Sequence, residues 1–238
     1  MAGRTQADGS GAARPRRLGM LVPSSNTVLE PETAKLLPRD GSVTCHVSRL
    51  PVVTISSEPG SLGQFDVAPV LAASALLADA RVDLILWNGT AASWLGFGHD
   101  ATLTEAIARA TGTPATTAVI AINAALASLG ARRIGLVTPY VAEIETGIAH
   151  NYAGIGIDVV AAERLDLTEN FAFGAVPAET VAGMIRAAAA ARPDAIVVMC
   201  TNFAGASVAD ALGEELGIPV IDSVRAAIGH CLARLVGG

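Results

Sequence analysis

The sequence lacks the features that mark membrane and nucleic-acid-binding proteins. Hydrophobic residues make up 51% of the 238 residues, yet Gly, Asp, Arg and Thr interrupt every apolar segment before it reaches the roughly 18 residues that a membrane-spanning helix needs. The formal net charge is −6, and Lys and Arg are scattered rather than clustered, which argues against a nucleic-acid surface. We therefore expect neither a membrane nor a nucleic acid among the partners.

Cysteine is scarce, and the common cofactor and metal motifs are missing. Three cysteines, far apart and odd in number, do not form a disulfide framework, and they favour a reduced, cytoplasmic protein. The four histidines show no metal-ligand spacing, and there is no Walker loop, dinucleotide fingerprint or nucleophile elbow. We expect no metal and no cofactor, which leaves a mechanism built on one thiol.

What the sequence does have is an internal repeat. Three stretches recur in the same order later in the chain, which indicates a structural duplication, and two copies predict duplicated α/β halves rather than a solenoid. Because strands alternate with helices throughout, each half should be a short parallel sheet flanked by helices. The matching pairs are Val82–Thr90 with Pro193–Thr201, Arg16–Pro23 with Arg132–Pro139, and Gly112–Pro114 with Gly217–Pro219.

The repeat places a thiol opposite a glycine. The apolar segment Ala195–Met199 is typical of a strand buried on both faces, and residues just beyond the carboxyl end of such a strand line the ligand crevice. Two halves related by an approximate two-fold axis would face their strand ends toward each other. Gly89 and Thr90 would then lie across one cleft from Cys200 and Thr201. The alternative for Cys200 is an inert buried thiol.

Small polar residues follow the first strand, Leu18–Val22, and precede a helix that runs to about Leu37. In this loop Ser25 and Asn26 either cap the helix or bind a carboxylate. Asn26 is the stronger candidate for binding because its carboxamide can donate a hydrogen bond. Tyr140 has the matching place in the second half, where it is either a buried anchor or a donor to the ligand.

The expected organisation is a disordered leader at 1–17, a first half made of 18–112 with 218–238, and a second half at 113–217. The leader is rich in Gly, Ala and Arg and lacks the apolar core of a signal peptide. The further strands are expected at 43–50, 84–87, 114–117, 134–138, 157–165 and 220–222, the further helices at 60–80, 101–110, 119–129, 177–191, 206–216 and 224–236, and a loop at 168–174.

Five short motifs occur in a fixed order and spacing: Val22–Thr27, Asn88–Thr90, Thr138–Tyr140, Asn170 and Cys200–Asn202. Together they resemble the aspartate/glutamate racemase superfamily, in particular its branch of maleate cis-trans isomerases and arylmalonate decarboxylases. The likeness spans residues 17–236. It implies an enzyme with its active site in the cleft between the halves, and it leaves open whether the chain forms a homo-oligomer.

The resemblance also assigns roles to single residues. Racemases and isomerases of this superfamily carry two cysteines, one from each half, whereas the decarboxylases carry one, with glycine opposite, as Gly89 is here. Asn26, Tyr140 and Asn170 match positions that hold substrate carboxylates in maleate isomerases. The decarboxylases have a hydroxyl residue directly after the glycine-threonine pair, and this sequence has Ala91 there. Ser25, Thr201 and Asn202 complete the expected substrate-binding set.

One thiol restricts the chemistry. Removing a proton from one face of a carbon and returning it to the other needs two acid–base groups, and nucleophilic isomerisation needs a thiolate. Decarboxylation instead leaves an enediolate, which needs charge stabilisation and one proton donor. We predict a cofactor-independent lyase that decarboxylates a substituted malonate-type dicarboxylate, with Cys200 as proton donor. The candidate stabilising donors are Thr90, Tyr140, Asn26 and the backbone N–H groups after Gly89 and Cys200. The pKa of the Cys200 thiol should not lie far below about 8.5. The alternatives are an isomerase or racemase, and a non-catalytic carboxylate-binding protein.

Overall fold

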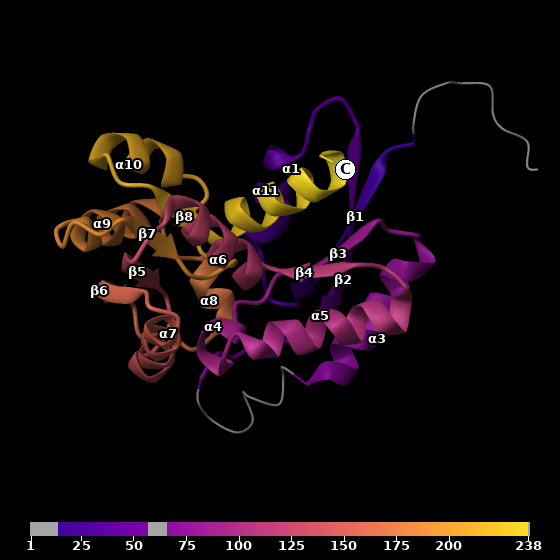
Figure 1. The fold of residues 1–238 in the computed structure, drawn as a ribbon, viewed down its shortest axis with the longest axis horizontal. Helices are drawn as coiled ribbons and strands as arrows, with labels where there is room; N and C mark the ends of the chain where they lie inside the picture. The colour runs from indigo at the N-terminus through magenta and orange to yellow at the C-terminus, as the bar shows by residue number, and fades with distance from the viewer. Residues whose placement is uncertain (1–13, 57–65, 238) are drawn as a thin grey trace, which may run out of the picture.

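The protein contains two four-stranded sheets with the same topology (Figure 1). The computed structural model describes residues 14–56 and 66–237. The strand orders are β2-β1-β3-β4 and β6-β5-β7-β8, and every pairing is parallel. The predicted fold class, two similar α/β halves, is confirmed. The strands are β1 (Arg16–Pro23), β2 (Val43–Leu50), β3 (Leu84–Trp87), β4 (Ala115–Thr117), β5 (Arg133–Thr138), β6 (Asp158–Arg164), β7 (Ala195–Val198) and β8 (Val220–Asp222).

Helices cover both sheets (Figure 1). Two of them, α4 and α7, were not predicted from the sequence. No helix in the described ranges combines the length and apolarity that a membrane crossing requires. The helices are α1 (Leu29–Leu36), α3 (Val67–Asp79), α4 (Ala92–Leu95), α5 (Gly98–Thr111), α6 (Ala118–Leu129), α7 (Ala142–Gly154), α8 (Asn170–Gly174), α9 (Ala178–Ala189), α10 (Ala209–Leu216) and α11 (Ser223–Val236).

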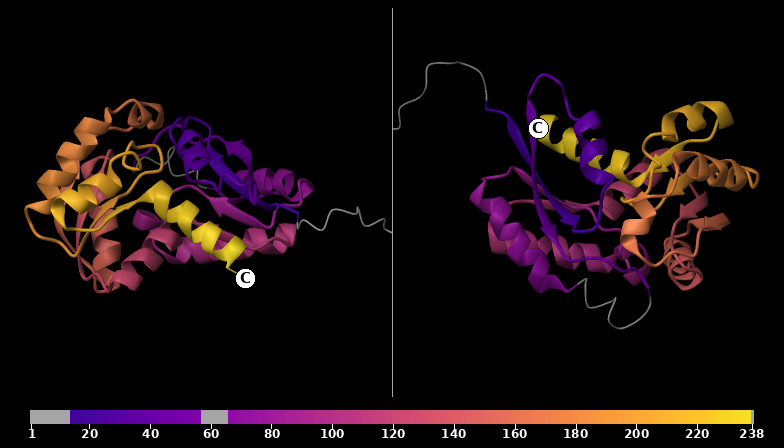
Figure 2. Two further views of the ribbon diagram at one scale, coloured as in Figure 1. Left: turned by 90° about the horizontal axis from the view of Figure 1, so that it is seen from above. Right: turned by 180° about the vertical axis from the view of Figure 1, so that it is seen from behind.

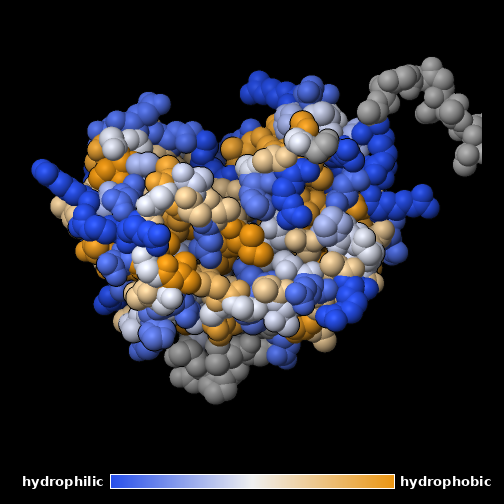
Figure 3. All heavy atoms as spheres, viewed as in Figure 1, coloured by the Kyte–Doolittle hydropathy of each residue, from blue (hydrophilic) through white to orange (hydrophobic). Residues whose placement is uncertain are grey.

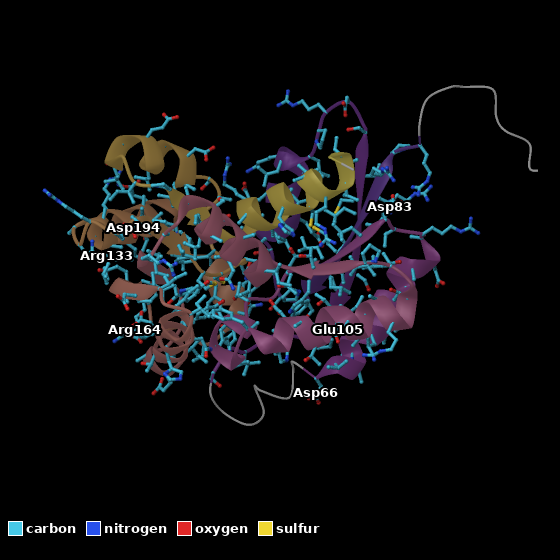
Figure 4. All side chains as sticks on the ribbon, viewed as in Figure 1. Asp66, Asp83, Glu105, Arg133, Arg164 and Asp194 are labelled. Carbon is cyan, nitrogen blue, oxygen red and sulfur yellow. The ribbon has the colours of Figure 1, made fainter. Side chains whose placement is uncertain are left out.

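The repeat extends to individual hydrogen bonds. The carboxylate of Asp83 accepts the backbone N–H of Arg17 at 2.8 Å, and that of Asp194 accepts the N–H groups of Arg132 and Arg133, each at 2.8 Å. In both halves the aspartate that precedes the central strand therefore fixes the start of the neighbouring strand. Figure 4 shows Asp83 in the first half and Asp194 beside Arg133 in the second.

The chain crosses between the halves after the short strands β4 and β8, not before them. The expected division gave 113–217 to the second half and 218–238 to the first, but β4 pairs with β3 and β8 pairs with β7. The crossing segments are the helices that follow. Helix α11 packs on the first sheet, in one apolar cluster with Leu18 and Met20, and Figure 2 shows it beside the β1 region. Each short strand thus completes its own sheet before the following helix leaves it.

Three further predictions differ from the structure or lie outside it. The segment expected as a loop at 168–174 contains the short helix α8. Strand β1 begins within the expected leader, since Arg16 pairs with Val43. Residues 1–13 of that leader and residues 60–65 of the helix expected at 60–80 lie outside the described ranges.

Candidate active site

The ends of β3 and β7 line one cavity between the two halves. Its volume is about 20 Å³, room for about one water molecule, and the space-filling view shows an indented surface where the halves meet (Figure 3). Gly89 and Cys200 both line this cavity, so the thiol and the glycine share one space. The lining residues are Pro23, Val52, Ile55, Trp87, Asn88, Gly89, Thr90, Trp94, Tyr140, Asn170, Cys200 and Thr201.

The two threonines after the strand ends make equivalent bonds across the cleft. Thr90 Oγ1 lies 2.8 Å from the hydroxyl of Tyr140, which follows β5 of the other half. Thr201 Oγ1 accepts a hydrogen bond from the Asn26 carboxamide at 3.2 Å and donates to the Asn88 carbonyl at 2.7 Å. The duplication thus places each threonine against the loop that follows the first strand of the opposite half.

Cys200 is held in its protonated form. Burial raises the pKa of its thiol from its ordinary value of 9.0 to about 12, and the charge of Asp222 adds to this rise. Two hydrogen bonds act in the opposite direction, from the Tyr140 side chain and from the backbone N–H of Asn202. Because burial is the larger effect, the thiol carries its proton at neutral pH, while two donors stand ready to stabilise the thiolate once that proton leaves.

Four residues that line the cavity at the strand ends have backbone N–H groups without an acceptor among the described residues. Those of Gly89, Thr90, Cys200 and Thr201 donate to no residue in the described ranges 14–56 and 66–237. All four follow the last sheet hydrogen bonds of β3 and β7, which are those of Asn88 and Met199. Such groups can hold a carboxylate or an oxyanion. Their presence on both walls gives the cavity donors that need no side chain, and Ala91 contributes no hydroxyl among them.

Asn26 and Asn202 lie behind the cavity and do not line it. Both side chains are buried, with 1% of their surface exposed. The side-chain oxygen of Asn26 accepts hydrogen bonds from the backbone N–H groups of Val28 and Leu29, at 3.0 and 2.9 Å. The side-chain oxygen of Asn202 accepts one from the N–H of Thr27, at 3.0 Å. The start of α1 is therefore capped by one carboxamide from each half, so the side-chain oxygens of Asn26 and Asn202 already accept hydrogen bonds in this structure.

Asn170 lines the cavity, and Ser25 supports it from outside. The Asn170 carboxamide donates to Ser25 Oγ at 2.8 Å, and Ser25 Oγ donates in turn to the Val52 carbonyl at 2.7 Å. The Asn202 carboxamide donates to the Asn170 carbonyl at 2.5 Å. Helix α8, which was expected as a loop, thus presents Asn170 to the cavity from a fixed backbone.

Aromatic rings fix the position of Tyr140. Its ring packs edge to face against Trp94, with centroids 5.3 Å apart, and against Phe173, at 5.6 Å. Among the other aromatic residues, Trp94 lines the cavity, Phe203 is fully buried and Phe171 is 57% exposed. Sequence reasoning missed Trp87 as a cavity residue, because a tryptophan inside a buried strand is indistinguishable from a core residue.

Two α/β halves that share a cavity between their strand ends, with a cysteine on one wall, define an enzyme of the aspartate/glutamate racemase type. The chain belongs to the arylmalonate decarboxylase family, which its sequence matches over residues 18–237. This places it in the branch of maleate isomerases and arylmalonate decarboxylases that the motifs indicated.

Similar proteins carry both activities. The chain is 27% identical to a maleate isomerase of Nocardia farcinica, over 89% of this chain and 86% of that protein. It is 26% identical to an arylmalonate decarboxylase of Bordetella bronchiseptica, over 93% and 90%. Among solved structures, the maleate isomerase of Pseudomonas putida matches with a TM-score of 0.83 and 26% identity over 92% of both chains. The fold and family are therefore shared with enzymes of two reaction classes.

Proposed function

We propose that the protein is a cofactor-independent decarboxylase of a substituted malonate-type dicarboxylate, with Cys200 as its single proton donor. The observation that carries this proposal is a buried, protonated thiol that shares a cavity with Gly89, a residue without a side chain. A reaction that needs one proton on one face suits this arrangement. A reaction that needs acid–base groups on both faces does not.

The proposed reaction has two steps. The bond between the α-carbon and one carboxylate breaks, CO₂ leaves, and the electron pair remains on the substrate as an enediolate. The Cys200 S–H then gives its proton to the α-carbon, a C–H bond forms, and the resulting thiolate takes a proton from solvent before the next turnover. A thiol with a pKa raised to about 12 holds its proton until a strongly basic carbanion-like centre appears.

Donors at the two strand ends suit the charge that develops in this reaction. The free N–H groups of Gly89 and Thr90 and the hydroxyl pair of Thr90 and Tyr140 lie on the wall where the enediolate oxygens would bind. Asn170 lines the cavity and is the side chain placed beside the carboxylate that remains, with its carboxamide oriented by its hydrogen bond to Ser25 Oγ. In this proposal Ser25, Asn26 and Asn202 position these groups from behind rather than contact the substrate, and Thr201 anchors the wall that carries Cys200.

Substituting Cys200 tests the proposal. Cys200→Ala should lower CO₂ release from a substituted malonate, such as 2-methyl-2-phenylmalonate, by at least about 100-fold, because general acid catalysis contributes on the order of 10²–10⁴. Cys231→Ala is the matched control, since Cys231 is also fully buried but lies in α11, away from the cavity. A Cys200→Ala protein with unchanged CO₂ release would remove the thiol from the mechanism.

A cis-trans isomerase is the second candidate. It is favoured by the similarity to maleate isomerases, including a second solved structure, from Nocardia farcinica, with a TM-score of 0.85. An isomerase would convert maleate to fumarate without releasing CO₂. Following both acids and CO₂ in one incubation separates the two activities. The raised pKa of Cys200 favours decarboxylation, because nucleophilic addition to a double bond needs the thiolate.

A further inference from the structure

The space that a side chain at position 89 would need is filled by the indole ring of Trp87. A Cβ atom built on Gly89 would lie 2.3 Å from both Cε2 and Cζ2 of Trp87 and 2.6 Å from its Nε1. Real Cβ atoms do not approach other atoms closer than 3.0 Å. The indole is 3% exposed and lines the cavity. The absence of a side chain at position 89 is therefore coupled to the presence of a large one at position 87.

Sheet pairing and hydrogen bonds hold the backbone at Trp87 and Asn88, the two residues before Gly89. Trp87 is paired with Leu21 of β1 on one side and with Thr117 of β4 on the other. The next residue, Asn88, donates its backbone N–H to the Leu21 carbonyl at 3.1 Å, and its carboxamide donates to the same carbonyl at 3.1 Å. Any side chain at position 89 must therefore displace the indole ring rather than the main chain.

The second half contains the reverse combination. By the repeat, Val198 corresponds to Trp87 and Cys200 to Gly89. Val198 packs against Gly205, where an added Cβ would lie 2.7 Å from Val198 Cγ1. In the first half the indole of Trp87 occupies the space beside position 89, whereas in the second half the smaller Val198 precedes Cys200, which lines the cavity. The first half uses Trp followed by Gly, and the second uses Val followed by Cys.

We propose that Trp87 is a specificity-determining residue: its indole occupies the site of a second acid–base group and so confines proton transfer to the Cys200 wall. This inference rests on the proposed one-thiol function and names the residue that enforces it. Its first consequence is steric. Gly89→Cys alone cannot place a thiol in the cavity, whereas Trp87→Val together with Gly89→Cys rebuilds the Val-and-Cys pair of the second half in the first.

The steric consequence can be tested without a substrate, with four proteins: wild type, Trp87→Val, Gly89→Cys and the double variant. Trp87→Val should lower the melting temperature of the wild type, because it removes a buried ring. The same change should raise the melting temperature of the Gly89→Cys protein, because it removes the clash. Equal shifts in both backgrounds would overturn the inference. If the Gly89→Cys protein does not fold, the same comparison of four melting temperatures is made with Gly89→Ser in its place.

The catalytic consequence is tested on the carbon that receives the proton. In the double variant one thiolate can take the α-proton of a product while the other thiol returns a proton to the opposite face, so no net chemistry occurs. Deuterium exchange into enantiopure 2-phenylpropanoate in D₂O should therefore be faster than in the wild type by at least about 100-fold, with loss of enantiomeric purity. Gly89→Cys alone should show neither change.

The two arms separate failure of this inference from failure of the proposed function. If the wild type releases no CO₂ from 2-methyl-2-phenylmalonate, the proposed function fails for this substrate, and the melting-temperature cycle alone decides whether Trp87 excludes a side chain at position 89. If the wild type releases CO₂ and the double variant folds but neither exchanges nor racemises the product, Trp87 does not determine the face of proton transfer, and the inference is overturned.

Discussion

The ends of β3 and β7 occupy equivalent positions in the duplicated fold but carry different side chains. Both β3 and β7 are central strands that end at a threonine which bonds to the opposite half. Before that threonine, β3 carries a bare glycine under an indole, whereas β7 carries a buried thiol. Thr90 pairs with Tyr140, which lines the cavity, whereas Thr201 pairs with Asn26, which lies behind it. In the proposed function, the duplicated scaffold has diverged into one wall that stabilises charge and one that supplies a proton.

The largest effect is expected on the charge-stabilising wall. Tyr140→Phe removes the hydroxyl that bonds Thr90 Oγ1 and contacts the Cys200 thiol, and loss of one such donor lowers kcat by on the order of 10²–10³. Tyr152→Phe is the matched control, because Tyr152 is also buried and donates to Asn123 at 2.9 Å, outside the cavity. Steady-state CO₂ release measures both, and equal effects from the two variants would contradict the assigned role of Tyr140.

The difference in packing predicts the next effect. Gly89→Ala forces a methyl group against the Trp87 indole, and such overpacking costs about 1–3 kcal/mol of unfolding free energy. Gly183→Ala, at an exposed site in α9 with no atom within 4 Å of the new methyl group, should instead stabilise by about 0.5–1 kcal/mol. Urea unfolding of both variants measures the contrast. A Gly89→Ala protein as stable as wild type would show that the indole moves aside freely.

The polar contacts behind the cavity predict a smaller effect on how the halves are joined. Asn202→Ala removes the acceptor for the N–H groups of Thr27 and Val28 and the donor to the Asn170 carbonyl. The N–H of Val28 keeps its bond to the Asn26 side chain, but the N–H of Thr27 and the buried Asn170 carbonyl lose their partner, which costs about 1–3 kcal/mol of unfolding free energy.

Asn151→Ala provides the control for that variant. Asn151 also links the halves, but through one bond of its carboxamide, to the Ser93 carbonyl at 3.0 Å, and it should cost about 1 kcal/mol. Urea unfolding measures both variants. If Asn202→Ala cost no more than Asn151→Ala, the shared capping of α1 would not hold the halves together.

The architecture could be predicted from the sequence because the repeat is visible in the apolar segments and in the residues that flank them. Ala195–Met199 predicted a buried strand, and its match with the segment around Leu84 correctly placed Gly89 and Cys200 on one cavity. The short helix α8 was missed because its sequence, Asn170–Gly174, has no helical periodicity over a single turn. The crossing points were placed one strand too early because β4 and β8 are only three residues long and give a weak signal for the sheet to which they belong.

The cavity itself was less predictable, because a residue's type does not reveal what already occupies its hydrogen bonds. The sequence predicted Asn26 as a substrate donor but could not show that its carboxamide donates to Thr201 and caps α1 in this structure. Trp87 was taken as strand core, yet its ring lies over Gly89. Both facts depend on side-chain directions across the cleft. The sequence contained one indication that Trp87 affects the site. The repeat aligns the large Trp87 with the smaller Val198, and two residues later it aligns Gly89, which has no side chain, with Cys200.

The smallest effect concerns the thiol wall and follows from protonation. Burial raises the pKa of Cys200 from 9.0 to about 12, so the folded protein holds a proton that the unfolded chain loses above pH 9. The contribution of this thiol to stability is therefore fully present below pH 9 and is lost as pH rises toward 12, by at most about 1.4 kcal/mol per pH unit. The difference in unfolding free energy between wild type and Cys200→Ala should stay constant from pH 7 to 8 and shift against the wild type between pH 9 and 10. A difference that stays flat to pH 10 would mean that the thiol on β7 titrates as an ordinary cysteine, and the two walls would then differ in shape alone.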